Sequence, residues 1–396
     1  MVKINMQKKN AKLCIITTVS ASIKAFYKGQ IEALNKAGFT TTVVCANDEK
    51  LKELIPAETR YYPVRLSRKI NPLRDAKAIY QLYKLFRKEK FDIVQYSTPK
   101  ASLLGAIAAF LAKAPIRIYI LWGLYYTGQK GMKRFVFKFF EKIICKLSNE
   151  IIPISHEMVD FALSEGLGKR AKYEVMLNGS ACGVDLEEFT PEKWESSRNR
   201  IRDNTTIPEY AIVVGTVARL TGDKGINELV RAFDAICNKI PLLYLLLVGE
   251  QEDKDRLLPS TEQIIRHNTR IKVVGWQINT PPYYAAMDIF CLPTYREGFG
   301  EVNLEAQAMG LPVVSTNVIG PRESVENNKT GFLVDSKSYE ALITPLKNLA
   351  NDSQLRKDMG QAGRNRIEQM FDRKDMIKAV VEHRLNLLKN ADKSND

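Results

Sequence analysis

The chain has 396 residues, of which 45% are hydrophobic and 26% are charged, and its formal net charge at pH 7 is +14. This length and this apolar content predict a globular chain with two domains and large cores, and they exclude a disordered one. The longest apolar run, residues 101–112, is shorter than the roughly 20 residues that a bilayer-spanning helix needs, so no membrane span is expected.

The first half of the chain alternates short apolar segments with helical ones. Basic residues precede the first apolar segment, but its β-branched residues and the lack of a small-residue cleavage site favour a strand over a secretory signal. Strands are predicted at residues 13–19, 40–46, 91–97, 116–122 and 150–155. Helices are predicted at residues 24–37, 72–90, 101–113 and 131–147.

The second half repeats this design. Strands are predicted at residues 211–218, 242–248, 271–275, 289–293, 312–316 and 331–334. Helices are predicted near residues 226–240, 253–267, 281–287, 302–309, 322–326 and 338–350. Short, uniformly apolar strands that alternate with helices are typical of parallel sheets covered on both faces. The predicted fold class is therefore α/β, with two Rossmann-like doubly wound domains that face a central cleft and bind ligands beyond the carboxyl ends of their strands.

A turn-rich segment without periodicity, residues 177–191, separates the two halves. We expect one domain at residues 1–185 and a second at residues 186–375. Residues 376–396 are expected to form a helix that returns to the first domain.

The positive charge belongs to one half of the chain. Residues 1–190 contain 31 Lys and Arg against 17 Asp and Glu, whereas residues 191–396 contain 28 of each class. A one-sided positive field is typical of proteins that meet nucleic acid, an anionic membrane surface or a phosphorylated ligand. The six cysteines form no CxxC pair and have no histidines at metal-ligand spacing, which predicts buried thiols in a cytoplasmic protein.

Two glutamates flank a small glycine loop in the second half. Glu297 and Glu305 are separated by seven residues that include Gly298-Phe299-Gly300. Glycines let backbone amides approach a ligand, and the N-terminus of the following helix, where Val302 and Asn303 stand, favours an anion such as a diphosphate. Since no G-x-G-x-x-G motif occurs, a nicotinamide cofactor is disfavoured.

Four segments carry motifs that are specific when they are taken together. They are residues 217–225 (VARLTGDKG), 247–250 (LVGE), 293–314 (PTYREGFGEVNLEAQAMGLPVV) and 320–334 (GPRESVENNKTGFLV). Over nearly its whole length, the chain resembles the retaining GT-B glycosyltransferases of family 4. The resemblance implies an acceptor-binding, membrane-facing first domain and a second domain that binds a nucleotide sugar.

The resemblance assigns roles to the conspicuous residues. Glu305 would accept hydrogen bonds from the ribose hydroxyls, and Glu297 would hold hydroxyls of the donor sugar. The diphosphate between them demands positive charge, which Arg219 and Lys224 would supply while the diphosphate leaves. The expected catalytic residues are Arg219, Lys224 and Glu297. The expected donor-binding residues are Glu305, Gly298, Phe299, Gly300, Gln277, Ile278, Val302 and Asn303, with Gln277 and Ile278 near the base.

No metal and no cofactor besides the nucleotide-sugar substrate is expected. An Asp-x-Asp pair occurs at Asp253 and Asp255, and such a pair holds a divalent ion in another glycosyltransferase fold. Here it lies among Glu250, Glu252 and Arg256 at a predicted helix start, which favours a solvated charge cluster.

The first half departs from the family pattern at one position. Many family members carry a histidine before Gly-Leu or Gly-Phe after the fourth strand, whereas residues 120–128 read ILWGLYYTG and place Trp122 there. The three histidines lie elsewhere, and we interpret them as surface or packing residues. The leaving phosphate itself would then take the acceptor proton. This variant, with residues 178–185 (NGSACGVD), resembles the branch that builds bacterial capsule and surface polysaccharides on lipid carriers.

Two basic segments suggest a membrane surface. Lys130, Arg134, Lys138, Lys142 and Lys146 recur every four residues on a helix that also carries phenylalanines. Basic and aromatic side chains on one helix suit an anionic bilayer, although a core-packed helix with a solvated lysine edge has the same pattern. Residues 65–77 are a second basic segment that could meet lipid headgroups or a prenyl-linked diphosphate, or could simply be solvated.

The sequence thus predicts a retaining hexosyltransferase that is cytoplasmic and peripheral on the inner face of the cell membrane. It would use a nucleotide sugar, most simply a UDP-sugar, and a polyprenyl-diphosphate-linked saccharide. A soluble acceptor is the alternative within this class. A basic nucleic-acid-binding protein is the alternative from another class. It is disfavoured because the charged half has no RNA-recognition or zinc-finger motif and the glycine-carboxylate cluster lies in the neutral half.

Overall fold

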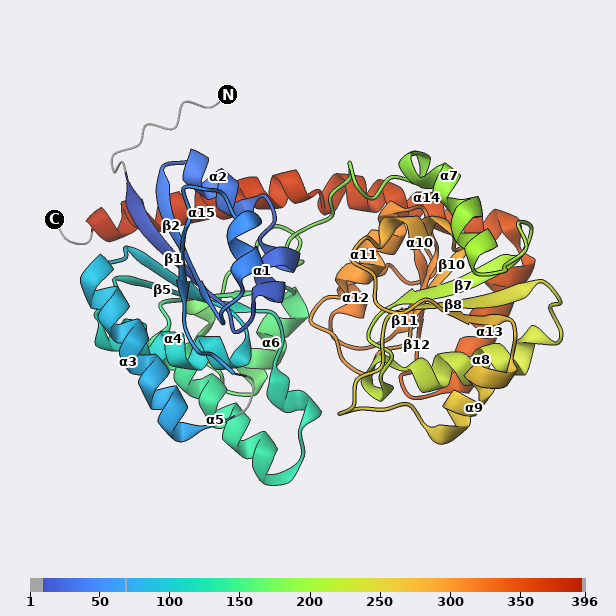
Figure 1. Cartoon of the computed structure of the whole chain (residues 1–396), viewed down its shortest axis with the longest axis horizontal. Coiled ribbons are helices and arrows are strands. Elements are labelled where there is room, and N and C mark those ends of the chain that lie inside the picture. The colour runs from blue at the N-terminus through green and yellow to red at the C-terminus, as the bar shows by residue number, and fades with distance from the viewer. Residues whose placement is uncertain (1–9, 68–69, 394–396) are drawn as a thin grey trace. The chain divides into compact units, whose positions relative to one another are not determined.

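The computed structural model describes residues 10–67 and 70–393 and divides them into two compact units (Figure 1). Unit 1 holds the chain up to Cys182 together with the C-terminal segment from Lys374, and unit 2 holds Gly183–Arg373. Each unit is built on a six-stranded parallel sheet. Within the described residues, no helix is both long and apolar enough to cross a bilayer.

The sheet of unit 1 has the strand order β3-β2-β1-β4-β5-β6. Its strands are β1 (Ala11–Ile16), β2 (Phe39–Cys45), β3 (Arg60–Pro63), β4 (Ile93–Tyr96), β5 (Ile116–Leu121) and β6 (Glu150–Pro153). The chain builds outward from β1 to β3 and then returns to add β4 on the other side of β1. This reversal places a topological switch point between β1 and β4, where open α/β sheets bind ligands.

Helices cover both faces of this sheet. They are α1 (Ser20–Phe26), α2 (Gln30–Lys36), α3 (Pro72–Glu89), α4 (Pro99–Leu111), α5 (Gly131–Leu147), α6 (His156–Ser164) and α15 (Arg373–Lys393). Helices α1, α2 and α15 pack on the face that carries Leu13 and Ile15. On the opposite face α4 lies between α3 and α5, and a Cβ at Gly105 would stand 3.1 Å from the Ile16 side chain. This close approach explains why a glycine occupies the middle of α4.

Unit 2 repeats the architecture with the order β12-β11-β10-β7-β8-β9. Its strands are β7 (Ile212–Val217), β8 (Leu243–Val248), β9 (Ile271–Val273), β10 (Ile289–Leu292), β11 (Val313–Thr316) and β12 (Gly331–Val334). Its helices are α7 (Pro191–Asn204), α8 (Ile226–Cys237), α9 (Pro259–His267), α10 (Pro281–Ala285), α11 (Glu301–Ala308), α12 (Pro321–Ser324), α13 (Tyr339–Asn351) and α14 (Ser353–Met370). The switch point lies between β7 and β10. The predicted fold class, two doubly wound Rossmann-like domains, is confirmed.

Several predicted elements differ from the observed ones. The helix expected at residues 24–37 is two helices, because Gly29 adopts φ 75° and begins α2 in a new direction. The helix expected at residues 253–267 begins only at Pro259, so Asp253 and Asp255 lie in a loop and not at a helix start. The edge strand β3 and the helices α6, α7 and α14 were not predicted.

Candidate active site

The predicted phosphate-binding and sugar-binding residues meet at the switch point of unit 2. Arg219 and Lys224 lie on the loop that follows β7, and Glu297 lies on the loop that follows β10. Because β7 and β10 are neighbours, their carboxyl ends bring these loops together. The site therefore forms where parallel sheets of this order bind ligands.

An ion pair joins the two loops. The Lys224 ammonium donates to a carboxylate oxygen of Glu297, and the side chains are only 16% and 21% exposed. Gly225 makes this approach possible, since it adopts φ 72° and a Cβ there would lie 1.9 Å from the Pro293 carbonyl oxygen. Partial burial strengthens the attraction by excluding water. Two residues that are 73 positions apart thus form one charged centre.

Arg219 lies in a mixed network of charges beside this pair. Its guanidinium contacts Glu252 at 2.8 Å and Asp223 at 3.5 Å. Asp223 also accepts from Arg296 at 3.1 Å and, through its backbone carbonyl, from the Tyr295 amide at 2.8 Å. The cations of the site are thus each paired with a carboxylate. From the sequence, Asp223 was not singled out, and Glu252 was assigned to a solvated charge cluster and not to the site.

The two aspartates of the Asp-x-Asp pair have different surroundings. Asp255 accepts the backbone N–H of Asp223 at 2.8 Å and so holds the loop that carries Lys224. The side chain of Asp253 is 89% exposed and pairs with Arg256. Among the described residues, the His and Glu side chains close enough to share a metal ion are in unit 1, at Glu150, Glu174 and His383.

The cluster of Glu150, Glu174 and His383 offers no histidine lone pair to a metal ion. Arg384 donates to Nδ1 of His383 at 2.8 Å, so the neutral imidazole carries its proton on Nε2, which faces Glu174 at 3.3 Å. Burial and the nearby Arg384 lower the pKa of His383 to about 3, which keeps the ring neutral. His383 is therefore a packing residue, as predicted. His267 is exposed on the surface, and its Nδ1 lies 2.9 Å from the Gln263 carbonyl oxygen.

The glycine loop presents backbone and not side chains. Phe299 is 1% exposed and packs against Phe371 with ring centroids 5.6 Å apart, so only its main chain can face a ligand. Gly300 adopts φ 95° and precedes α11 as its N-cap. The loop is backed by Gly320, where a Cβ would stand 3.0 Å from the Gly298 carbonyl. A bulkier residue at position 320 would displace the loop.

The first turn of α11 is tied to its neighbours. The amide of Asn303 donates to the Gly300 carbonyl at 2.8 Å, and its buried side chain donates to the Ser324 hydroxyl at 3.0 Å. Val302 is half-buried. The side-chain nitrogen of Asn303 therefore orients α11 against α12, while its buried Oδ1 accepts no hydrogen bond within the described residues.

Glu305 is held by a tyrosine that sequence reasoning missed. The buried Tyr284 of α10 donates its hydroxyl to Oε2 of Glu305 at 2.7 Å. Burial raises the pKa of Glu305 to about 7, although the Tyr284 hydrogen bond opposes the rise. The side chain of Glu305 is half-buried. Its raised pKa lies close to neutral pH. The hydroxyl of Tyr284 fixes one oxygen and leaves the other for a partner.

Gln277 and Ile278 follow β9 at the same edge of the sheet. The Gln277 side chain donates to the Val274 carbonyl at 2.7 Å and steadies the loop, while Ile278 is 85% exposed. Their place near a ligand base stays a prediction.

The basic helix α5 of unit 1 does not present its five cations on one side. Residues four apart on an α-helix drift by about 40°, so the series from Lys130 to Lys146 winds around the helix. Arg134 and Lys138 meet Glu165 at 3.6 and 2.7 Å, whereas Lys142 and Lys146 are exposed. The four-residue recurrence therefore does not place these cations on one face of α5, and the binding of this helix to an anionic bilayer stays a prediction.

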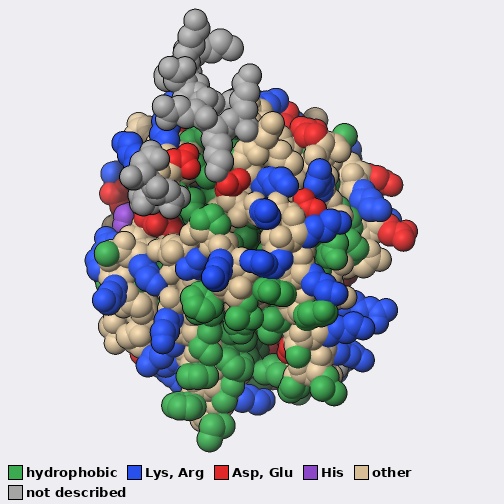
Figure 2. Space-filling model, turned by 90° about the vertical axis from the view of Figure 1, so that its left-hand side faces the viewer, with side chains coloured by type: hydrophobic (Ala, Val, Ile, Leu, Met, Phe, Trp, Pro, Cys, Tyr) green, Lys and Arg blue, Asp and Glu red, His purple; other side chains and the backbone are tan. Residues whose placement is uncertain are grey.

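A different stripe does face outward on α5. Met132, Phe135 and Phe139 are 76%, 69% and 54% exposed, and together with Lys142 and Lys146 they recur at intervals of three and four residues. We call these five residues the α5 stripe. Figure 2 shows one side of the molecule, on which hydrophobic side chains gather with Lys and Arg around them. The second predicted basic segment, residues 65–77, includes Arg68 and Lys69, which lie outside the described residues.

Comparison with known proteins gives consistent matches over both units. The profile of the family described as "Glycosyl transferases group 1" matches residues 197–366, and that of "Glycosyl transferase 4-like" matches residues 12–155. The capsular polysaccharide biosynthesis glycosyltransferase CapM of Staphylococcus aureus is 35% identical over 365 residues, which are 92% of this chain and 94% of that protein.

A second relative and a solved structure extend the comparison. The UDP-Gal:alpha-D-GlcNAc-diphosphoundecaprenol alpha-1,3-galactosyltransferase of Escherichia coli is 29% identical over 358 residues, 88% of this chain and 90% of that protein. Anabaena HepE, solved in complex with UDP and glucose, superposes with a TM-score of 0.77 at 20% identity, covering 94% of this chain and 99% of the other. The structural match shows the shared fold.

Proposed function

Because this chain belongs to the family of group 1 glycosyl transferases, we propose that it transfers a hexose-type sugar from a UDP-sugar to a polyprenyl-diphosphate-linked saccharide. The anomeric configuration is retained, and the product serves the synthesis of a capsule or another surface polysaccharide. The Lys224–Glu297 ion pair at the switch point of unit 2 carries this proposal. It places a cation for the diphosphate directly beside a carboxylate for the sugar.

The order of the charged groups in the site matches the order of ribose, diphosphate and hexose in a nucleotide sugar. Tyr284 donates to one carboxylate oxygen of Glu305, and the other oxygen accepts hydrogen bonds from the ribose hydroxyls. Arg219 and Lys224 bind the diphosphate, and the N-terminus of α11 behind the glycine loop adds to the positive potential. Glu297 then accepts hydroxyls of the hexose, whose anomeric carbon is bonded to the diphosphate. The relative from Escherichia coli is named for a UDP-sugar donor, which favours UDP here.

Departure of the diphosphate is the step that the cations assist. As the glycosidic bond breaks, negative charge grows on the β-phosphate, and Lys224 and Arg219 stabilise it where it develops. A phosphate oxygen then takes the proton of the acceptor hydroxyl, which attacks the same face of the sugar. This role for the phosphate fits the presence of Trp122, an indole without basic nitrogen, where family members have a histidine.

The ion pairs also explain how the site avoids an uncompensated charge before the donor arrives. Lys224 is 16% exposed and would be costly to leave unpaired. A diphosphate competes with Glu297 for the ammonium, and Glu297 is released toward the sugar hydroxyls. The exchange couples recognition of the two ends of the donor, and it needs no divalent ion.

Unit 1 provides the acceptor side of the proposal. The α5 stripe combines exposed phenylalanines with lysines, which suits peripheral binding to the inner, anionic face of the cell membrane. A lipid-linked acceptor would be reached from that surface. The two relatives are named for capsular polysaccharide and for an undecaprenyl-diphosphate-linked acceptor, in agreement with this assignment.

The test is a transfer assay with purified full-length protein, a panel of radiolabelled nucleotide sugars, and vesicles that contain polyprenyl-diphosphate-N-acetylglucosamine. We expect one UDP-sugar to label the lipid fraction with retained configuration, as established by NMR of the product. Labelling of water-soluble oligosaccharides alone would replace the lipid acceptor with a soluble one. Tight, salt-dependent binding to random DNA without turnover of any nucleotide sugar would contradict the proposal.

A further inference from the structure

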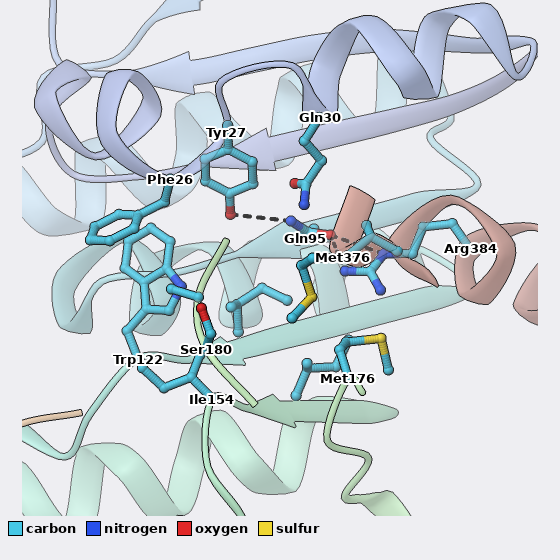
Figure 3. A pocket seen from close by; sticks show the side chains of 14 residues that line it. Phe26, Tyr27, Gln30, Gln95, Trp122, Ile154, Met176, Ser180, Met376 and Arg384 are labelled. Carbon is cyan, nitrogen blue, oxygen red and sulfur yellow. Dashed lines mark hydrogen bonds between the residues drawn. The ribbon is translucent and has the colours of Figure 1, made fainter. Parts of the chain in front are cut away.

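A small polar cavity lies within unit 1, apart from the donor site. Its walls come from α1 and α2, from the strands β4, β5 and β6, from the segment after β6 and from α15 (Figure 3). It has a volume of about 30 Å³ and is partly open. A single water needs roughly 10–15 Å³ of such space, so the cavity has room for about two water-sized groups.

One side of the cavity is a linear chain of hydrogen bonds. The buried Arg384 of α15 donates to Oε1 of Gln95 through Nε and Nη2, at 3.1 and 2.7 Å. The Gln95 amide nitrogen donates to the Tyr27 hydroxyl at 3.1 Å, and that hydroxyl lies 3.3 Å from Ser97. Since arginine can only donate, the direction of the chain is fixed. These groups are satisfied without a ligand, and they hold Tyr27 in place.

Two buried polar atoms of the cavity lining are not satisfied in the described structure. Nε1 of Trp122 is an N–H donor without an acceptor, and Oε1 of Gln30 is a carbonyl acceptor without a donor. Gln30 is 6% exposed. Trp122 is fixed by Phe26, with ring centroids 4.4 Å apart. Figure 3 shows the Gln30 amide and the Trp122 indole directed into the same pocket. One open donor and one open acceptor call for a ligand group that has both functions.

We propose that this cavity is the subsite for the 2-acetamido group of the acceptor's terminal sugar. The amide carbonyl accepts from Trp122 Nε1, the amide N–H donates to Gln30 Oε1, and the methyl group packs against apolar side chains such as Met176 and Met376. The oxygen and the methyl group are each close to a water molecule in size, so the cavity volume fits an acetyl group. That this group belongs to the acceptor rests on the proposed function.

The lining favours a neutral amide over an anion. A carboxylate or phosphate has no proton to donate and would leave Oε1 of Gln30 unsatisfied, whereas an amide N–H satisfies it. The positive group at the cavity, Arg384, already donates to Gln95 and to His383. The Escherichia coli relative is named for a GlcNAc-linked acceptor, a sugar with the same 2-acetamido group.

The inference is tested by binding, independently of transfer. The probes are a short-chain alkyl diphosphate carrying N-acetylglucosamine and its glucose counterpart, titrated calorimetrically into the full chain. We expect the unmodified protein to bind the acetamido probe about tenfold more tightly, as two added hydrogen bonds would give. Trp122→Phe, which keeps an aromatic ring but removes the N–H, and Gln30→Leu should each reduce this preference to about threefold, with the glucose probe unaffected.

A matched control is Trp194→Phe in unit 2, whose indole donates to the Glu188 carbonyl and lies outside the cavity. Melting curves establish that each variant is folded.

Equal binding of the two probes to the unmodified protein overturns the subsite, as does a preference that survives both substitutions. If the acetamido probe is preferred but no lipid acceptor receives sugar, the subsite stands and the proposed function fails. If both acceptors receive sugar equally well and bind equally, the proposed function stands and the subsite fails.

Discussion

The carboxyl edges of the two sheets can be compared directly, because both sheets place their first and fourth strands side by side. In unit 2 the loops at this edge carry Arg219, Lys224 and Glu297, which pair with opposite charges. In unit 1 the corresponding edge carries Trp122, packed against Phe26 beside a cavity with two unsatisfied polar atoms. One edge therefore presents paired charges, whereas the other presents an aromatic ring and neutral polar atoms. The shared scaffold sets where a ligand binds, and the loops decide its chemistry.

The largest effect that would sharpen this comparison is expected from Lys224→Ala. Loss of a cation that stabilises charge developing on the leaving group should lower kcat by about 10²–10³-fold, with a smaller rise in the donor KM. Steady-state kinetics with saturating acceptor measure both. Lys254→Ala, an exposed lysine on a neighbouring loop, is the control and should leave both constants unchanged. A rise in KM with unchanged kcat would contradict the role in the transition state.

The next largest effect separates the two carboxylates of unit 2. Glu305→Ala should weaken binding of UDP about 10²-fold, because a half-buried charged acceptor for the ribose is lost. Glu297→Ala should leave UDP affinity within about twofold and lower turnover instead, since its proposed partner is the sugar. Calorimetry with UDP and kinetics with the UDP-sugar distinguish the two, with Glu301→Ala on the same helix as control. Equal losses of UDP affinity would refute the division of roles.

For unit 1, the α5 stripe should bind anionic vesicles through charge and apolar contact together. Changing Lys142 and Lys146 to Glu should weaken vesicle binding by at least about 30-fold, since each lysine lost costs roughly 1 kcal/mol near the surface and each glutamate adds repulsion. Added salt should weaken binding of the unmodified protein. Sedimentation with vesicles gives the partition coefficient. The matched pair Lys254→Glu and Lys357→Glu, exposed in unit 2, should have little effect. If both pairs weaken binding alike, the stripe has no special role.

A smaller, pH-dependent effect follows from Glu305. Its pKa of about 7 in the folded protein lies above the ordinary value, so its contribution to stability is present at low pH and is lost as pH rises through 7. Donor binding has the opposite trend, because ribose hydroxyls donate to the ionised form. UDP-sugar affinity should rise by up to about tenfold between pH 6 and pH 8, and this dependence should vanish in Glu305→Gln. A UDP-sugar is used because its diphosphate diester does not titrate in this range.

The smallest effects concern the Asp-x-Asp pair. Asp255→Ala removes the acceptor of the Asp223 amide and should weaken donor binding by about fivefold through the loop of Lys224. Asp253→Ala should change nothing measurable, and excess chelator should leave transfer activity intact. Loss of activity on chelation, restored by magnesium or manganese, would reverse the assignment of Arg219 and Lys224 to the diphosphate.

The sequence was sufficient for most of the fold, because apolar strands alternating with helices leave few other architectures. Prediction from the sequence failed for elements whose position does not depend on an apolar pattern. Helix α7 was missed because it is anchored by charge: Arg198 and the fully buried Arg202 both pair with Asp288. The edge strand β3 is short and mostly exposed, so it carries no apolar signal. The break at Gly29 depends on a single positive φ that the helical pattern does not reveal.

The site was predictable in its residue types but not in its pairings. The motifs placed Lys224, Glu297 and Glu305 on the right loops and helix. The contact of Lys224 with Glu297 and the clamp of Tyr284 on Glu305 join residues far apart in the chain, which no local pattern encodes. On α5, the basic residues recur every four positions. Because an α-helix has 3.6 residues per turn, residues at this spacing shift progressively around the helix axis.

Helix α15 has a consequence for how the chain is made. Met376, Val380 and Leu388 belong to the core of unit 1, yet all of unit 2 separates them from Cys182 in the sequence. During translation, the strands β1 to β6 therefore leave the ribosome long before the helix that covers them. Unit 2 is continuous and can complete its own core first. Unit 1 is thus expected to finish folding last, against the usual N-to-C order. Until α15 has left the ribosome, one apolar face of its sheet stays exposed and can bind chaperones.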